Sequence, residues 1–262
     1  MLSSLRNLFR HRALLQALTQ RELHARYRGS VLGFLWSFLN PLLLLAVYTF
    51  AFGYVLSPRL GAGPDNYALF LFTGILPWTW FSAAVLEGAG TVLGGGALLK
   101  KVVFPAEVLP LVAVLANGVQ FLLSLPVLVV VLVLFGNPPD GYAVLVVPLL
   151  LIQLLLTAGL TLLVSALTVL FRDLRDILGH LMTLWFFTTP VIYELHVIPA
   201  TFRNLMRFNP MAQVIRGWQD ALFFSRPPSL TGLAGAAAVA VVTLVLGYFV
   251  FDRLREVFPE EV

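Results

Sequence analysis

Six long stretches of this chain contain no charged residue, and this feature limits the possible folds more than any other. An α-helix needs about 20 apolar residues to cross a hydrocarbon core of about 30 Å. Five of the stretches reach that length, whereas the stretch from 177 to 193 has only 17 residues. The chain is therefore predicted to be an integral membrane protein with about six membrane crossings. The six stretches are 29–58, 66–86, 108–139, 141–171, 177–193 and 227–251.

The composition excludes a water-soluble fold. Only 11% of the residues are charged and the mean hydropathy is +0.91, whereas soluble domains carry about 25% charged residues. A β-barrel would instead show short alternating segments. Six crossings with short loops use nearly all of 1–262, so we expect an all-α polytopic protein with a single transmembrane domain. Any domain that hydrolyses ATP must then belong to another chain.

The distribution of basic residues predicts the orientation. Counted on alternate sides of the crossings, twelve Lys and Arg lie on one side and five on the other. The positive-inside rule places the richer side, with both termini, in the cytoplasm. The first apolar run is too long for a signal peptide, so no cleaved leader is expected. The predicted transmembrane helices are 31–56, 68–93, 110–135, 142–170, 177–193 and 230–251, and Pro77 should kink or break the second.

Three segments outside these helices have recognisable patterns. Residues 11–28 place leucines near one face and basic residues elsewhere, which predicts an amphipathic interfacial helix; a plain arginine cluster that anchors the first crossing is an equally good reading. Residues 98–106 form a short basic segment stopped by Pro105, which predicts a cytosolic helix. Residues 195–225 are predicted to form re-entrant helices on the outer side, because irregular backbone within the membrane must lie against protein or water. The alternative is two helices lying flat on the outer surface.

The sequence lacks the residue patterns of catalysis. No phosphate-binding loop occurs, and the four histidines lack metal-ligand spacing, so no cofactor or metal is expected on this chain and it is not predicted to be an enzyme. Glu87 is the one plausible charge inside a crossing, and we place it near the cytosolic interface rather than in a proton relay. The cluster from Arg172 to Asp176 carries both signs, which favours salt-bridged docking of a partner. No nucleic-acid partner is indicated.

The order of these parts resembles the membrane permease subunit of bacterial ABC exporters of lipid-linked polysaccharide. The resemblance extends over nearly the whole chain, and its most specific motifs are Arg-Tyr-x-x-Ser-x-x-Gly-x-x-Trp, Pro-Trp-x-x-Phe, Lys-x-x-Phe-Pro and Phe-Arg-Asp. The matching stretches are RELHARYRGSVLGFLWSFLNPLLLLAVYTFAF at 21–52, LFTGILPWTWF at 71–81, LLKKVVFPAEVLP at 98–110, LFRDLRDIL at 170–178, TPVIY at 189–193 and FNPMAQVIR at 208–216.

The resemblance implies a homodimer in the bacterial cytoplasmic membrane, docked on a cytosolic ABC ATPase homodimer that carries ATP and Mg. It further implies a coupling helix at 98–106, a headgroup site on a gate helix at 11–28 and an outer gate at 195–225. Arginine suits a diphosphate headgroup because its planar fork pairs phosphate oxygens bidentately. The residues assigned in this way are Lys100, Lys101, Phe104, Pro105, Arg172 and Asp173 for coupling, Arg26, Tyr27 and Arg28 for the headgroup, and Asn209, Pro210 and Arg216 for the outer gate.

An uncharged wall suits a sugar polymer, because the C–H faces of sugars stack on aromatic rings. Candidate lining residues are Tyr48, Phe52, Trp78, Phe81 and Trp185, although such aromatics also pack between helices or face lipid. The predicted function is export of a lipid-linked polysaccharide, first of all an O-antigen-type glycan on undecaprenyl diphosphate. A capsule or teichoic acid polymer, or a small lipid or drug, is the alternative within ABC exporters, and an ion-coupled secondary transporter is the alternative from another class.

Overall fold

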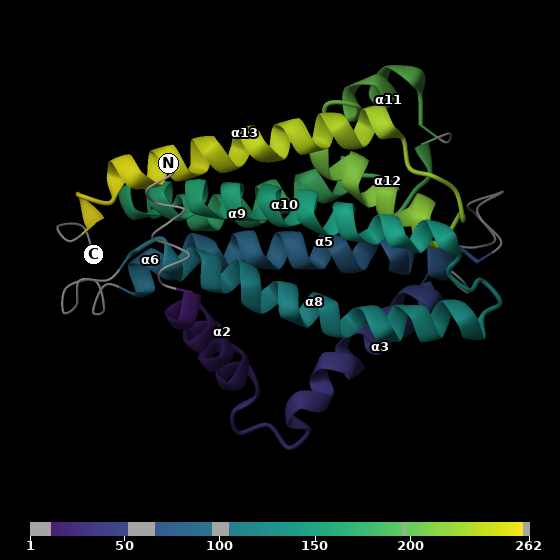
Figure 1. Ribbon diagram of the computed structural model, residues 1–262, viewed down its shortest axis with the longest axis horizontal. Coiled ribbons are helices and arrows are strands. Elements are labelled where there is room, and N and C mark those ends of the chain that lie inside the picture. Colours follow the sequence, from purple (N-terminus) through teal and green to yellow (C-terminus); the bar gives the residue numbers. More distant parts are fainter. Residues whose placement is uncertain (1–11, 52–65, 96–104, 196–197, 259–262) are drawn as a thin grey trace.

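The computed structural model describes residues 12–51, 66–95, 105–195 and 198–258, and within these ranges all regular structure is helical (Figure 1). The elements are α2 (Arg12–Tyr27), η1 (Gly33–Leu35), α3 (Trp36–Tyr48), α5 (Tyr67–Ala89), α6 (Thr91–Gly94), α8 (Val108–Leu134), η3 (Gly141–Leu145), α9 (Val146–Leu170), α10 (Leu174–Phe187), α11 (Ala200–Met206), α12 (Pro210–Leu222) and α13 (Leu230–Leu254).

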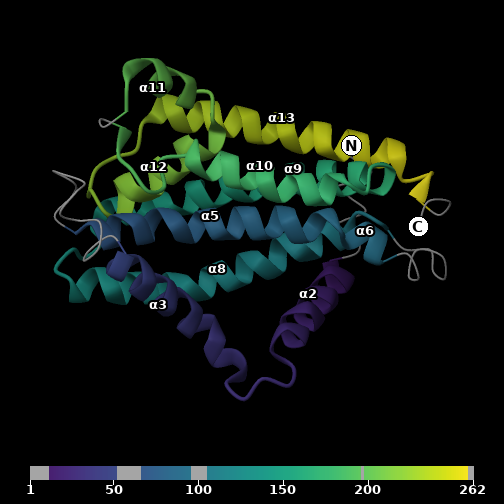
Figure 2. The same cartoon turned by 180° about the vertical axis from the view of Figure 1, so that it is seen from behind.

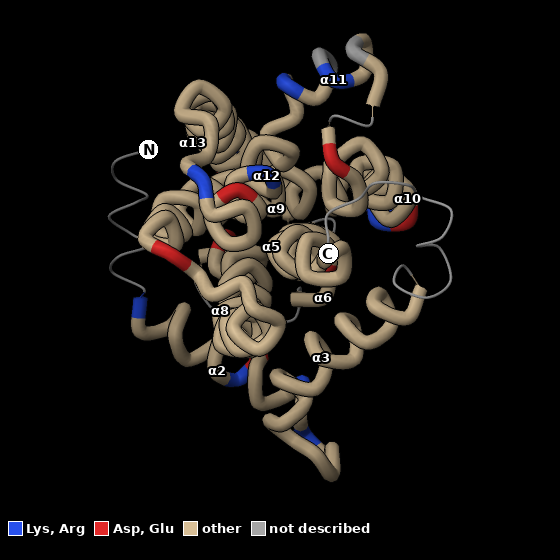
Figure 3. The backbone as a smooth tube through the Cα atoms, turned by 90° about the vertical axis from the view of Figure 1, so that its right-hand side faces the viewer, with Lys and Arg blue, Asp and Glu red and all other residues tan. Residues whose placement is uncertain are grey.

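The long helices form a bundle in which α5 is innermost. It contacts α3, α8, α9, α10 and α12, and most of its residues are buried (Figure 3). The start of α2 and the end of α13 lie at the same end of the bundle as α6, which is the end predicted to be cytoplasmic (Figure 1). The core of the bundle is therefore built around the second predicted crossing.

Within the described ranges, five helices are long and apolar enough to cross a membrane. They are Gly33–Ala51, Tyr67–Ala89, Val108–Leu134, Gly141–Leu170 and Leu230–Leu254. They correspond to five of the predicted crossings, with ends that differ by a few residues. The predicted first crossing also includes 52–56, which lie outside the described residues.

The predicted helix at 177–193 needs correction. In its place α10 runs from Leu174 to Phe187, and its 14 residues reach only about 21 Å. The chain then turns, with the Thr188 and Thr189 hydroxyls donating back to the Trp185 carbonyl, three to four residues earlier. Pro190 follows directly, and a proline cannot donate the next helical hydrogen bond. The helix therefore ends before the charge-free stretch does.

Two further expectations concern prolines. The prediction at Pro77 was a kink or a break; the helix α5 continues through this residue, so there is no break, and the kink stays a prediction. Packing supports the helix at this point, because the Gln153 side chain of α9 donates to the Pro77 carbonyl over 2.7 Å. The predicted helix at 98–106 lies mostly outside the described residues; Pro105 and Ala106 are described, are not helical, and precede α8.

The first two helices, α2 and α3, form a V beside the bundle, facing α8 (Figures 1 and 2). The chain reverses between them at Gly29 and Gly33, whose φ angles are 81° and 48°. Glycine takes such positive values at little cost because it has no Cβ. Most of the segment 11–28 forms the helix α2, which packs on α8, and its location at the membrane interface stays a prediction.

Close backbone contact joins α9 to α13. A Cβ added at Gly247 would lie 2.0 Å from the Gly159 carbonyl oxygen, and one at Gly159 would lie 2.4 Å from the backbone nitrogen of Leu244. Small residues let membrane helices approach in this way. We expect Gly247→Ala to destabilise the fold by about 1–3 kcal/mol, because the backbone must shift to admit a methyl group.

Thermal unfolding of the purified protein in detergent tests this expectation. The matched control is Gly235→Ala on the same helix, because an added Cβ there meets no atom within 4 Å. Equal melting temperatures for the two variants would show that α9 and α13 do not pack through these glycines.

Candidate functional site

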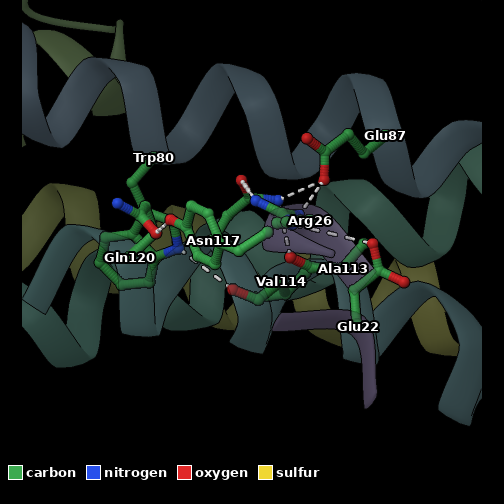
Figure 4. Close-up of polar contacts among 9 residues, drawn as sticks. Glu22, Arg26, Trp80, Glu87, Ala113, Val114, Asn117 and Gln120 are labelled. Atoms are coloured by element: carbon green, nitrogen blue, oxygen red, sulfur yellow. Dashed lines mark hydrogen bonds and ion pairs between the residues drawn. The ribbon is translucent and has the colours of Figure 1, made fainter. Parts of the chain in front are cut away.

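A polar network joins the V to the bundle near the end predicted to be cytoplasmic (Figure 4). Arg26, on α2, donates through one terminal nitrogen to the Glu87 carboxylate at 2.5 Å and through the other to the Asn117 side-chain oxygen at 3.0 Å. The Asn117 amide also donates to Glu87, at 2.7 Å, and Glu22 lies 3.7 Å from the Arg26 Nε. Three helices, α2, α5 and α8, therefore meet at one arginine.

The next residue of α2 extends this connection to α3. The Tyr27 hydroxyl donates to the Gln120 side-chain oxygen on α8 and lies 2.9 Å from the Ser37 hydroxyl on α3. Gln120 in turn donates to the Ser37 carbonyl, at 3.4 Å. Both arms of the V are thus hydrogen-bonded to the same face of α8.

The network explains the position of Glu87. Its carboxylate is about half exposed, whereas the Arg26 side chain is only 22% exposed. Glu87 lies two residues before the end of α5; that this end of the helix faces the cytosol stays a prediction. No sequence pattern identified Arg26 as the partner of Glu87, but Asn117, Gln120 and Ser124 recur at intervals of three and four on the otherwise apolar helix α8. That spacing places the three side chains on one face of α8, and it indicates a polar face on that helix.

A cavity of about 970 Å³ lies between α2, the turn after it and α8. Its basic residues are Arg21, His24 and Arg28, and Tyr27 and Gln120 add polar groups. Leu23, Phe34, Val119 and Leu123 supply its apolar wall. A cavity with cationic and apolar sides is suited to an anionic amphiphile, because guanidinium groups bind phosphate while the wall takes hydrocarbon.

A smaller cavity of about 270 Å³ lies between α3, α5 and α8 and shares Gln120 with the first. Its polar residues are Asn40, Thr79, Asn117, Gln120 and Ser124. One wall is formed by Trp80 and Phe121, whose rings stack at 5.1 Å. Polar groups are thus continuous from the cationic cavity into the membrane-spanning part of the bundle.

The headgroup residues predicted from the resemblance occupy different environments. Arg26 and Tyr27 are engaged in the network, whereas Arg28 is exposed and lines the cationic cavity. Arg21 and His24 were not predicted, yet they line the same cavity. Arg21 and His24 lie about two turns and one turn before Arg28, so helical spacing alone could have grouped them.

Four of the five predicted lining aromatics are described, and Phe52 lies outside the described residues. Trp78 and Phe81 are 5% and 0% exposed, and they pack on Phe186 and Trp185. Tyr48 and Trp185 are half-buried. Within one protomer these rings therefore belong mainly to the packing between α5 and α10.

The predicted outer-gate residues Asn209 and Pro210 begin α12. The Asn209 side-chain oxygen accepts from the Ala212 backbone N–H at 3.2 Å and from the Trp185 indole at 2.9 Å. Asparagine before proline is a common helix start, because the amide caps a free N–H and proline suits the first turn. Asn209 thereby connects α12 to α10, and Arg216, two turns along, lines a separate cavity at the outer end.

The predicted ATPase-coupling residues are only partly described, because Lys100, Lys101 and Phe104 lie outside the described ranges. Arg172 and Asp173 are exposed in the turn between α9 and α10. The neighbouring Arg175 lies against the junction of α5 and α6, with its Cζ 3.6 Å from where a Gly90 Cβ would be. The 171–176 turn and the segment that leads into 98–106 therefore lie together at one end of the bundle.

The described ranges hold no three His, Asp or Glu side chains close enough to bind a metal. Long apolar helices, a short helix, α2, bonded to the bundle, and cavities that combine basic and apolar groups define a multi-pass membrane protein of the transport class. The family profile for ABC-2 type transporters matches residues 13–223. The chain belongs to this family, and is a membrane transport subunit without a nucleotide-binding domain, which implies an ABC ATPase as its partner.

Curated relatives cover almost the whole chain. The O-antigen export system permease protein RfbA of Myxococcus xanthus is 43% identical over 264 aligned residues, which span 100% of both chains. A protein of the same name from Klebsiella pneumoniae is 34% identical over 94% of each chain. The polysialic acid transport protein KpsM of Escherichia coli is 24% identical over 92% of this chain and 93% of its own.

Proposed function

We propose that this chain is the permease subunit of an ATP-driven exporter that moves an O-antigen-type glycan, linked to undecaprenyl diphosphate, out of the cytosol. Two copies would form the channel in the bacterial cytoplasmic membrane, docked on two ATPase subunits that carry ATP and Mg. The observation that carries this proposal is the cationic cavity beside α2, which combines phosphate-binding and apolar groups. The names of the RfbA relatives support the same substrate class.

In this proposal the lipid headgroup enters the cationic cavity. Arg28 and Arg21 pair the diphosphate oxygens, with His24 as a third donor, and the wall around Phe34 and Leu123 takes the first prenyl units. Arg26 and Tyr27 hold α2 against α8, so that the cavity keeps its shape. The two parts of the predicted headgroup motif therefore have different tasks.

The proposal treats α10 as a sixth, short crossing that leads into re-entrant helices. Burial of α12 supports this topology, because ten of its 13 residues are buried and Trp218 is 0% exposed. The Trp218 indole donates to Gln153 on α9, at 3.1 Å. A helix lying flat on the outer surface would expose one side to water, so α12 fits better as a helix that dips back between the others.

A channel between two copies would use the faces that one protomer leaves open. On α3 and the turn after it these are Leu43, Val47 and Phe50, and on α10 they are Leu181, Leu184 and Phe187. The half-buried Tyr48 and Trp185 border these faces and are the best placed of the predicted lining residues. Contact with the ATPase is assigned to Lys100, Lys101, Phe104 and Pro105, with Arg172 and Asp173 as a second contact.

Replacing both cavity arginines tests the headgroup site. We expect Arg21→Gln with Arg28→Gln to weaken binding of undecaprenyl diphosphate to the permease in nanodiscs by about 100-fold, since each lost charged hydrogen bond costs about 1.5–3 kcal/mol. The matched control, Arg12→Gln, removes one charge from the exposed start of the same helix and should bind normally. Unchanged binding in the double variant would refute this site.

A capsule polymer is the second candidate cargo, favoured by the 24% identity to a polysialic acid transport protein. Mass spectrometry of lipid that copurifies with the permease distinguishes the two. A polyprenyl diphosphate supports the first proposal, whereas a phosphatidylglycerol-type anchor supports the second.

A further inference from the structure

A cavity of about 240 Å³ at the outer end of the bundle has a chemistry that neither the gate nor the channel explains. It lies between the first turn of α5, the segment 190–195 after α10, and the second half of α12 with the turn that follows. All of these segments lie at the outer ends of their helices. The volume is below the usual range for drug-sized ligands and suits one small ring.

The floor of this cavity offers hydrogen-bond acceptors that the protein itself does not use. Asp220 and Gln219 are only 5% and 3% exposed. Arg226 donates from Nε to Asp220 Oδ1 at 2.7 Å, and its Nη2 lies 2.6 Å from the same oxygen in an ion pair. Within the described ranges, Asp220 Oδ2 therefore has no hydrogen-bond partner. The Gln219 side-chain nitrogen donates to the Pro190 carbonyl, and the Gln219 side-chain oxygen has no partner among the described residues. Both residues line the cavity, so these two oxygens can accept hydrogen bonds from a ligand or from water.

Donors and aromatic rings complete the lining. The Arg216 guanidinium is half-buried and forms no hydrogen bond or ion pair with any other described residue. Arg226 lies 4.4 Å from the centre of the Phe224 ring, and Tyr193 supplies a second half-buried ring. A carboxylate, a guanidinium and ring faces together bind the hydroxyls and the C–H faces of a sugar.

The charge balance distinguishes among sugars. The lining contains two guanidinium groups, Arg216 and Arg226, and two carboxylates, Glu194 and Asp220, so its formal charge is zero. An anionic ligand such as a phosphate or a uronic acid would meet two carboxylates as well as two guanidinium groups. An uncharged ring with several hydroxyls is complementary to the whole set.

We propose that this cavity, formed around Arg216, Asp220 and Phe224, is an outer subsite that binds one uncharged pyranose ring of the emerging glycan. The subsite rests on the proposed function and deepens it, because it assigns a place where the polymer is held after crossing. It also gives Arg216, predicted only as part of an outer gate, a specific binding role.

Photocrosslinking during export tests the subsite. A benzophenone amino acid is placed at Leu195, in the lining, or at Tyr142, which is exposed in η3 at the same end and lies outside the cavity. In cells that express the permease, its ATPase and the host's neutral O-glycan, we expect illumination to attach polymer at position 195 and little at 142. Equal attachment at both positions would overturn the proposal.

Variants then test the chemistry. Arg216→Gln should reduce attachment at 195 by about tenfold, as expected for the loss of one charged hydrogen bond, and Arg216→Lys should restore part of it. Arg216 has no described partner, so its replacement should leave the fold intact, as a melting temperature will show. Unchanged attachment in Arg216→Gln would also contradict the subsite.

The proposed function and the outer subsite are refuted by different results. If deleting the permease leaves surface glycan unchanged, the proposed function fails. If export depends on the permease but position 195 captures no polymer, only the subsite fails.

Discussion

Replacement of Arg26 with Gln is expected to reduce glycan export about tenfold or more. The substitution removes the ion pair with Glu87 and one of the hydrogen bonds that hold α2 against α5 and α8. A hydrogen bond to a charged group contributes about 1.5–3 kcal/mol, so loss of about 2 kcal/mol would raise the population of detached α2 about 30-fold. Export is measured as polymer on the cell surface.

Exchanging the two charges tests whether export depends on the ion pair between Arg26 and Glu87 or on either residue alone. Arg26→Glu and Glu87→Arg should each impair export, whereas the double variant should recover much of it, since the pair is restored in reverse. Arg12→Gln is the matched control on the same helix. Failure of the swap to recover any export, with normal protein levels, would show that Arg26 acts on the substrate rather than on the position of α2.

Detachment of α2 can be followed directly because the natural chain contains no cysteine. A single cysteine at Leu23, which lines the cationic cavity, reports on access to that cavity. We expect a water-soluble maleimide to label it faster in the Arg26→Gln background. Equal labelling rates would contradict the anchoring role.

Replacement of Lys100 and Lys101 with Glu is expected to abolish association with the ATPase. The chain has only these two lysines, and they fall in the segment assigned to coupling. Reversal of both charges changes the formal charge of the segment by four units. Like charges at an interface cost several kcal/mol, which is enough to lower association at least about 100-fold.

Copurification of the ATPase with the tagged permease measures this effect. Arg253→Glu is the control, because Arg253 is exposed near the end of α13 and is predicted to be cytoplasmic, like Lys100 and Lys101. A permease with Glu at 100 and 101 that still retains the ATPase and exports glycan would disprove the coupling assignment.

The sequence predicted the long helices well because their signal is physical and local. A run of more than 20 apolar residues has one stable form in a bilayer, a helix that satisfies its own backbone. The short helix α10 shows the limit of that signal. Its apolar run continues to Tyr193, but the turn at Thr188 and Thr189 ends the helix earlier.

The polar contacts between helices could not be predicted from the sequence alone. Arg26 and Asn117 are 91 positions apart, and no pattern along the chain pairs them. The resemblance drew attention to Arg26 and Tyr27 as residues, but their contacts became apparent only when α2 was seen packed on α8. Asn209 was different, because an asparagine before a proline at a helix start is a local signal that its capping contact bears out.

The central claim, that this chain moves a lipid-linked glycan when a partner ATPase hydrolyses ATP, is tested most directly in proteoliposomes. The permease and the ATPase encoded beside it are reconstituted with a glycan linked to undecaprenyl diphosphate, and access of the glycan to a membrane-impermeant glycosidase is followed. We expect the glycan to cross only when ATP is hydrolysed, and an ATPase variant that cannot hydrolyse ATP to abolish crossing. Movement without the ATPase, driven by an ion gradient, would contradict the account.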